Sequence, residues 1–178
     1  MKIYKFLVSC ALVVELCVGI STLAHAERGI QGQQKHAYTE YEKLVLKNVS
    51  EFHKNFSNHE FYKNSALVTD NIIFNTSGTE YNGRDAFVNA ITDFAAPFPD
   101  AKITDLVTIV DGNTAAIRYV LTGTHKGEFK TPNGVVAATG RKVKVDGIEI
   151  FTFDKDGKVT EIVGIDNVNQ LLKQIQSK

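Results

Sequence analysis

The chain has 178 residues, with 20 basic and 20 acidic side chains and a formal net charge of zero at pH 7. This balanced charge gives no electrostatic reason to expect a nucleic acid or an anionic membrane surface as a partner. The length suits one domain of ordinary size, and no internal repeat or low-complexity segment divides the sequence.

The first residues have the pattern of a secretory signal peptide. Lys2 and Lys5 precede an apolar run over residues 6–20, and Ala24-His25-Ala26 is an A-x-A cleavage site. We therefore expect cleavage after Ala26 and export to the periplasm or the medium. The apolar run is too short to span a bilayer, so we expect no stable membrane anchor. A lipoprotein anchored at Cys10 is the alternative, although Cys10 lies before most of the apolar run.

Cleavage at this site would leave 152 residues with 18 basic and 19 acidic side chains. Both cysteines leave with residues 1–26, so the mature protein would have no disulfide, thiolate nucleophile or cysteine metal ligand. Residues 27–34 carry two Gly and three Gln without an apolar period, which predicts a flexible tether. Residues 35–178 then form the single domain.

Apolar residues that recur at steps of three and four predict a long first helix. They are Tyr38, Tyr41, Val45, Val49, Phe52 and Phe56. A short helix is expected over residues 59–66, and a third begins at Arg84 and is stopped by Pro97 and Pro99. His53 and His59 are six residues apart near helix ends, a poor spacing for a metal, so we expect both to face solvent.

The rest of the chain is rich in strand patterns. A short strand is expected over 71–75, with a strand end and turn at 80–83, and antiparallel sheet from 102 to 165. Turns are predicted at 111–113, 132–134 and 154–157, and a last helix over 168–176. This order predicts an α+β fold whose curved antiparallel sheet wraps around the N-terminal helices and encloses an apolar pocket. We expect Phe52, Phe87, Phe98 and Phe151 to line that pocket.

Several standard catalytic motifs are absent: the sequence has no G-x-S-x-G, no P-loop and no H-E-x-x-H. Other short motifs follow one another in a distinctive order. They are F-P-D at 98–100, R-x-x-x-T-G-T-H-x-G-x-F at 118–129, T-G-R at 139–141, G-I-x-I-F-x-F at 147–153, D-G-K at 156–158 and a closing motif from Asp166 to Gln174.

This ordered set resembles the SnoaL-like polyketide cyclases, or ester cyclases, of the nuclear transport factor 2 superfamily. The resemblance covers nearly the whole mature chain. It implies a cone-shaped fold with a deep pocket, and ring closure in a polyketide ester by an intramolecular aldol reaction without metal or cofactor. It also implies that Asp166 is the acid/base and that His125 is the second polar residue of the site.

The residues themselves support a role for Asp166 and leave alternatives open. Asp166 ends an apolar strand, where desolvation would raise its pKa and suit it to proton transfer next to a carbonyl. His125 could donate a hydrogen bond to an enolate oxygen. The alternatives are that Asp166 caps the last helix, and that His125 lies at a strand end near the surface.

We expect the substrate to contact Tyr81, Phe98, Asp100, Arg118 and Phe151. One departure from the family pattern stands out. Family members usually carry a tryptophan shortly before the matched aspartate, whereas this sequence has no Trp and places Ile162 near that position. The wall of the pocket is therefore altered.

Three functions remain open on the sequence alone. The first is cofactor-free acid/base chemistry on a small apolar carbonyl compound, which the presence of both His125 and Asp166 favours. The second is binding of a small apolar molecule without turnover, which the missing Trp and the export signal favour. The third is an interaction module that uses the outer face of the sheet. A homodimer is expected in each case, because curved open sheets of this superfamily often pair with a second copy.

Overall fold

A capping box fixes the start of the first helix in the computed structural model, which describes residues 37–131 and 134–176. Thr39 Oγ1 accepts a hydrogen bond from the Glu42 backbone N–H at 3.2 Å, and Glu42 Oε2 accepts one from the Thr39 backbone N–H at 2.8 Å. Helix α2 then runs over Glu40–Ser57. Its predicted apolar stripe is confirmed, since Val45, Val49, Phe52 and Phe56 are all buried.

The other helices also lie where the sequence predicts them. The second is a short 3₁₀ helix, η1, over Phe61–Ala66. Helix α3 spans Arg84–Ala95 and buries Phe87, Ile91 and Ala95, and helix α4 spans Val168–Gln176.

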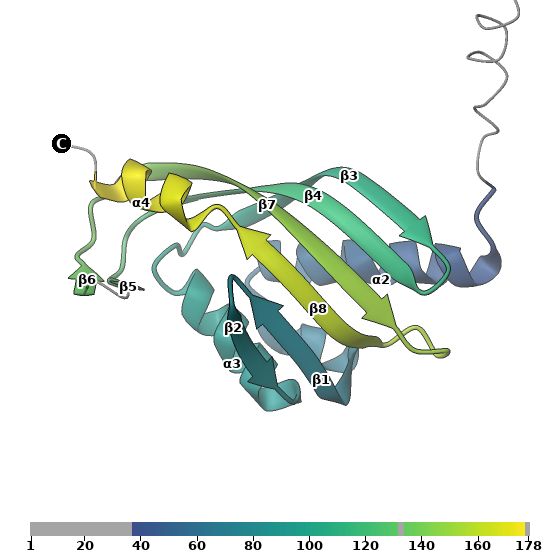
Figure 1. Ribbon diagram of the computed structural model, residues 1–178. Coiled ribbons are helices and arrows are strands. Elements are labelled where there is room, and N and C mark those ends of the chain that lie inside the picture. Colours follow the sequence, from purple (N-terminus) through teal and green to yellow (C-terminus); the bar gives the residue numbers. More distant parts are fainter. Residues whose placement is uncertain (1–36, 132–133, 177–178) are drawn as a thin grey trace, which may run out of the picture. The chain divides into compact units, whose positions relative to one another are not determined.

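Six strands form one sheet in the order β2-β1-β8-β7-β4-β3 (Figure 1). They are β1 Val68–Thr76, β2 Thr79–Asn82, β3 Lys102–Asp111, β4 Thr114–Thr124, β7 Lys142–Phe153 and β8 Val159–Asp166. A separate hairpin pairs β5 Phe129–Thr131 with β6 Gly134–Val136. Of the turn predicted at 132–134, residues 132 and 133 lie outside the described residues.

The predicted all-antiparallel sheet needs one correction, because β1 and β8 pair in parallel. A parallel pair requires a long connection between its strands, and residues 77–158 supply it. The strands that the sequence predicted after residue 102 pair as expected, with β3–β4, β4–β7 and β7–β8 all antiparallel.

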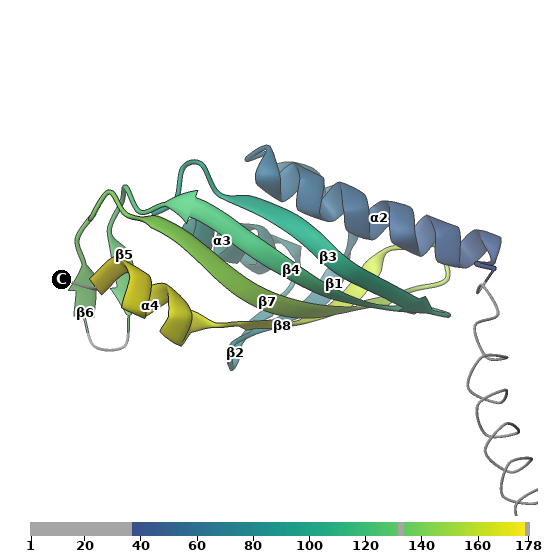
Figure 2. The same ribbon diagram turned by 90° about the horizontal axis from the view of Figure 1, so that it is seen from above.

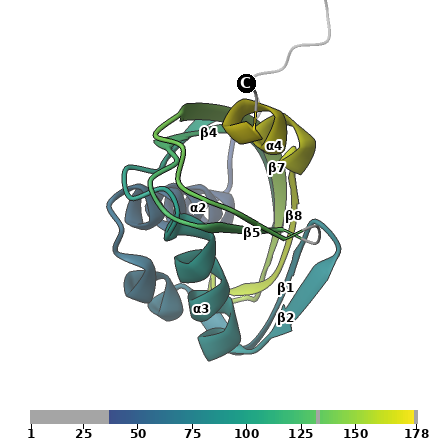
Figure 3. The same cartoon turned by 90° about the vertical axis from the view of Figure 1, so that its left-hand side faces the viewer.

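Within residues 38–178, which form one unit, the sheet curves around the helices. Figure 2 shows α2 lying alongside β3, and Figure 3 shows α2 and α3 on the concave side of the sheet. The core therefore lies between the helices and the inner faces of the strands.

The predicted signal peptide and tether lie outside the described residues, so cleavage after Ala26 and export stay predictions. Among the described residues, no helix is long and apolar enough to cross a membrane.

The outer face of the sheet carries a group of exposed apolar side chains, which we call the outer apolar patch. Its members are Val107, Ile109, Ile148, Ile150, Val163 and Ile165. The strand register places Ile148 opposite Ile165 and Ile150 opposite Val163, so β7 and β8 contribute adjacent pairs. Contiguous exposed apolar surface of this kind marks an interaction site.

We expect two copies of the chain to pair through the outer apolar patch. Light scattering after gel filtration should give twice the chain mass for the wild type and the monomer mass for Ile148→Lys, because a buried unpaired ammonium opposes association. Val135→Lys is the matched control, since Val135 is equally apolar and exposed but lies on β6. A monomeric wild type at micromolar concentration would contradict this expectation.

Candidate active site

One row of residues crosses four strands on the inner face of the sheet. The register pairs Asp105 with Tyr119, Tyr119 with Gly147, and Gly147 with Asp166. Residues directly opposite each other point to the same side of a sheet, so the side chains of this row share the concave face. Two carboxylates and a phenol are thereby aligned across β3, β4, β7 and β8.

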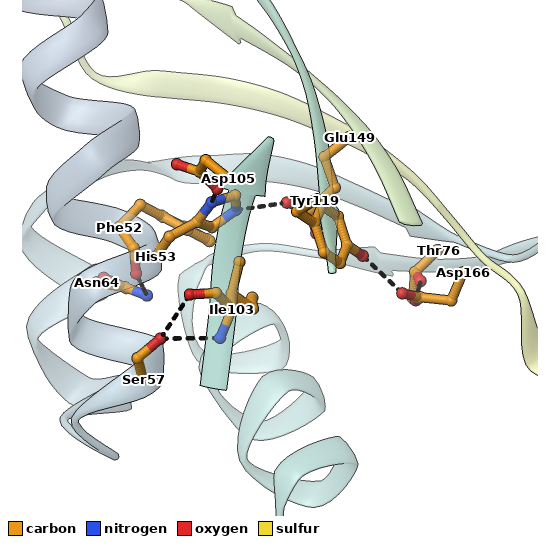
Figure 4. A network of polar contacts seen from close by, with 10 residues as sticks. All are labelled: Phe52, His53, Ser57, Asn64, Thr76, Ile103, Asp105, Tyr119, Glu149 and Asp166. Carbon is orange, nitrogen blue, oxygen red and sulfur yellow. Dashed lines mark hydrogen bonds and ion pairs between the residues drawn. The ribbon is translucent and has the colours of Figure 1, made fainter. Parts of the chain in front are cut away.

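Gly147 makes this alignment possible because it has no side chain. A Cβ atom at position 147 would lie 2.3 Å from Tyr119 Cζ, far inside van der Waals contact. The Tyr119 ring therefore lies across β7, and its hydroxyl donates a hydrogen bond to Asp166 Oδ1 at 2.6 Å (Figure 4). A glycine inside a strand commonly marks such a close approach.

Asp166 is the last residue of β8, and its environment favours the protonated carboxyl. Burial raises its pKa above the ordinary value. The hydrogen bond from Tyr119 opposes this rise, the negative charge of Glu149 adds to it, and a weak bond from Thr76 Oγ1 at 3.4 Å opposes it again, with a net increase. The sequence-based expectation of a raised pKa is thus met.

Asp166 does not cap the last helix, which removes the alternative reading of this residue. Asn167 does so instead: its Oδ1 accepts a hydrogen bond from the Gln170 backbone N–H at 3.0 Å, and its carbonyl accepts one from Leu171. The Asp166 carboxylate is therefore directed to Tyr119 and Thr76 alone among its described hydrogen-bond partners.

The expectation that His53 faces solvent is wrong, whereas His59 is exposed. The His53 side chain is 4% exposed and lies between two carboxylates. Its Nδ1 is 2.6 Å from Asp105 Oδ1, and its Nε2 is 2.9 Å from Glu149 Oε2 (Figure 4). Burial alone would lower the pKa of His53, but the hydrogen bonds and charges of these carboxylates raise it to about 9.

A β-bulge helps to form this cluster. The register between β3 and β4 shifts between Asp105 and Val107, which leaves one extra residue on β3. Bulges of this kind redirect side chains, and here Asp105 points to the inner side where α2 lies. The three-residue set of Asp105, His53 and Glu149 is called the histidine cluster below.

A cavity of about 640 Å³ opens on the inner face between the sheet and α3. Its apolar wall combines aliphatic side chains, such as Ile91, Ile103 and Leu121, with aromatic ones. The aromatic members are Phe52, Phe56, Phe74, Tyr81, Phe94 and Phe129. The polar groups of the wall include Thr76, Tyr119, Glu149 and Asp166. A mainly apolar pocket with a few converging polar groups is typical of a small-molecule site.

The structure does not bring His125 to this cavity. His125 is fully buried behind Phe129, whose ring lies 6.5 Å from the imidazole and does line the cavity. Its Nδ1 is 3.0 Å from Thr139 Oγ1, and burial lowers its pKa. His125 therefore lies neither in the cavity with Asp166, as the resemblance implied, nor near the surface, which was the alternative.

Of the five expected substrate contacts, only Tyr81 lines the cavity. Phe98 and Phe151 are fully buried in the core, as is Phe87, so Phe52 alone represents the four expected pocket phenylalanines. Asp100 is exposed and accepts two hydrogen bonds from Thr124, at 2.6 and 2.7 Å, which tie the start of β3 to the end of β4.

Arg118 also departs from its expected place. It is exposed on the outer side of β4, where it forms an ion pair with Asp146 at 3.2 Å. Alternation along the strand explains this position, because Arg118 precedes the inward-facing Tyr119 and must point to the opposite side.

The family model for SnoaL-like polyketide cyclases matches residues 47–175. No curated protein gives a significant match. A candidate SnoaL-like polyketide cyclase from Jannaschia sp. CCS1 has a TM-score of 0.72 at 16% identity, over 80% of this chain and 99% of that one. AclR, a candidate hydroxylase from Streptomyces galilaeus, has a TM-score of 0.67 at 21% identity, over 77% and 98%.

Another structure with a similar fold is named for a different reaction. An LEH-like epoxide hydrolase from M. tuberculosis has a TM-score of 0.58 at 13% identity, over 75% of this chain and 90% of that one. These likenesses show that the described domain has the nuclear transport factor 2-like fold, as the sequence predicted. They do not carry an activity, since one fold hosts many reactions.

We expect Gly147→Ala to lower the free energy of unfolding by about 1–3 kcal/mol, because the new methyl group displaces the Tyr119 ring. Urea denaturation measures the loss. Gly164→Ala is the matched control on the same face, where a Cβ would meet only ordinary contacts at 3.5 Å or more. In the Tyr119→Ala background the Gly147→Ala change should cost much less. An equal cost in both backgrounds would show that Tyr119 is not what Gly147 accommodates.

The second expectation concerns His53, whose pKa is 6.5 unfolded and about 9 folded. A pKa raised by folding gives stability that is complete below pH 6.5 and is lost as the pH rises through 9. The wild type should therefore lose about 3 kcal/mol of stability between pH 6 and pH 10. His53→Gln should lose much less over that range, as measured by urea denaturation at each pH. Parallel losses in both proteins would contradict an imidazolium at position 53.

Proposed function

Because the chain belongs to the SnoaL-like polyketide cyclase family, we propose that it is an enzyme that moves protons on a small apolar carbonyl compound, with Asp166 as acid/base and no cofactor. One observation carries this proposal. A carboxyl group with a raised pKa forms part of the wall of a largely apolar cavity and accepts a hydrogen bond from Tyr119.

The chemistry of an aldol-type cyclisation fits a single carboxyl group of this kind. The ionised carboxylate takes a proton from the carbon next to a carbonyl, and the electron pair of that bond passes to the carbonyl oxygen as an enolate. The enolate carbon attacks a second carbonyl of the same molecule, which forms the new C–C bond and an alkoxide. The carboxyl group then returns its proton to the alkoxide, so the enzyme ends as it began.

Tyr119 supports this role by holding Asp166 in place. Burial and the charges of Glu149 and Asp166 raise the pKa of Tyr119 well above its usual range, so its hydroxyl stays a donor. A protonated phenol that donates at 2.6 Å fixes the carboxylate through Oδ1, while Oδ2 accepts only a weak bond from Thr76 at 3.4 Å and can also contact a bound molecule. The apolar part of the wall excludes water and binds the apolar body of the substrate.

Binding without turnover is the second candidate function, and specific observations favour it. His125 lies outside the cavity, and Ile162, near the usual position of the family's tryptophan, is fully buried. The apolar cavity would serve as a ligand site even if Asp166 moved no proton. We propose export for either function, on the basis of the signal-peptide pattern in residues 1–26.

We expect the protein to accelerate deuterium uptake at the carbon next to the carbonyl of 2-tetralone, a neutral bicyclic ketone, in D₂O. Asp166→Asn should reduce this exchange about 100-fold or more, because it removes the acid/base while keeping the shape. Proton NMR of the ketone measures the rate. Asp156→Asn, in the exposed turn before β8, is the control that should leave the rate unchanged.

Stability distinguishes loss of chemistry from loss of fold. A carboxyl group with a raised pKa costs stability once it ionises, so Asp166→Asn should have a Tm equal to or above that of the wild type at pH 7. Binding of 2-tetralone with no exchange above the buffer rate would favour the binding function instead.

A further inference from the structure

Glu149 is a second carboxylate in the wall of the same cavity, and the mechanism proposed for Asp166 does not use it. It lies on β7 two residues after Gly147, so it points to the same inner face. It lines the cavity with a side chain that is 14% exposed, and Gly164 lies opposite it on the neighbouring strand β8. A bound molecule in the cavity could therefore contact both Glu149 and Asp166.

The histidine cluster prepares Glu149 for a different role from that of Asp166. Glu149 Oε2 accepts the hydrogen bond from His53 Nε2, and no hydrogen bond to Oε1 is found among the described residues. The pKa of His53 is raised to about 9, so this contact is a charge-assisted hydrogen bond that holds the Glu149 carboxylate through Oε2. Asp105, which is 30% exposed, engages Nδ1 and so fixes the orientation of the ring.

Among the described residues, the cationic group that contacts Glu149 is His53, whereas the cation of the cavity wall itself is Lys130. His53 from α2 faces Asp105 from β3, Glu149 from β7 and the ring of Tyr119 from β4, whose centroid is 5.6 Å away. Asp166 from β8 adds a negative charge. Asp93 from α3, with Glu128 and Lys130 at β5, completes the charged side chains of the cavity wall.

We propose that the acid/base role given to Asp166 in the proposed function is divided between two carboxyl groups. Glu149 is a second catalytic carboxylate that accepts the proton from carbon in place of Asp166, His53 is its positioning residue, and Asp166 keeps the acid half of the role as the proton donor. This assignment deepens the proposed function and rests on it. Two carboxyl groups that lie in one cavity with different hydrogen-bond partners can divide the acid and base roles between them.

The proton balance of the first step is complete with these two groups. Glu149 Oε1 takes the proton from the carbon next to the carbonyl, and the electron pair of that bond moves to form the C=C bond of an enol. The carbonyl oxygen takes the proton of Asp166 at the same time. One proton has entered Glu149 and one has left Asp166, so the total charge of the site is unchanged.

A probe that requires only a base tests this assignment separately from carbonyl chemistry. In 5-nitrobenzisoxazole a carboxylate removes the proton on carbon, the electron pair forms the C≡N bond, and the N–O bond breaks to release a coloured phenolate. We expect the wild type to accelerate this elimination and Glu149→Gln to lower the rate about tenfold or more. Asp166→Asn should lower it less than about threefold, since Asp166 is the donor and not the base.

Glu51→Gln is the matched control, because Glu51 lies on α2 with a partly exposed side chain whose ion-pair partner is Lys54. It should leave the elimination rate unchanged. A wild type without acceleration, or a rate that depends on Asp166 and not on Glu149, would overturn the assignment. Loss of carbonyl exchange in 2-tetralone with retained, Glu149-dependent elimination would instead refute the proposed function and leave Glu149 as the base.

The pH profile tests His53 in a way that a merely structural role would not. In the wild type the rate should fall as the pH rises through about 9, where His53 loses its proton, and His53→Gln should lack this falling limb. Asp105→Asn removes one of the two carboxylates that raise the pKa of His53, so its falling limb should lie at lower pH. An unmoved limb in both variants would overturn the role of His53, whatever their rates.

Discussion

The hydrogen bond between Tyr119 and Asp166 connects two strands that are not neighbours, and the arrangement of the site depends on it. The Tyr119 ring must pass over β7 to reach Asp166, and only a residue without a side chain at position 147 permits this. The same crossing places the phenol between Asp166 and the histidine cluster. A single glycine thus links a carboxyl group at the end of β8 to a buried ion pair near the edge strand β3.

The curvature of the sheet explains why polar groups on four strands can converge on an otherwise apolar cavity. Their side chains share the concave face, which α2 and α3 cover and where apolar residues form most of the wall. Burial raises the pKa of Asp166, which has no described cation beside it, and so favours its neutral form. Burial alone would lower the pKa of His53, but the two carboxylates beside it raise the pKa and favour the imidazolium.

The sequence predicts the fold better than the site, for physical reasons that particular residues illustrate. Apolar periodicity identifies α2 and α3, and turn residues identify the β3–β4 and β7–β8 hairpins, because these signals are local. The parallel β1–β8 pair is not local and was missed.

Among the site residues, His53 had a usable signal, since it lies four residues after the buried Val49 and so shares its face. Asp105 had none, because a bulge sets its direction. Arg118 could have been excluded by alternation with Tyr119.

The parallel pairing of β1 with β8 also has a consequence for the order in which the domain assembles. The two strands are separated by about 80 residues of chain, so their contact carries a large loop-closure cost and forms late. Thr76 belongs to the first of these strands and Asp166 to the second, and they meet only when this closure occurs. Local hairpins such as β3–β4 can form earlier, while the polar end of the cavity is among the last parts of the molecule to become native.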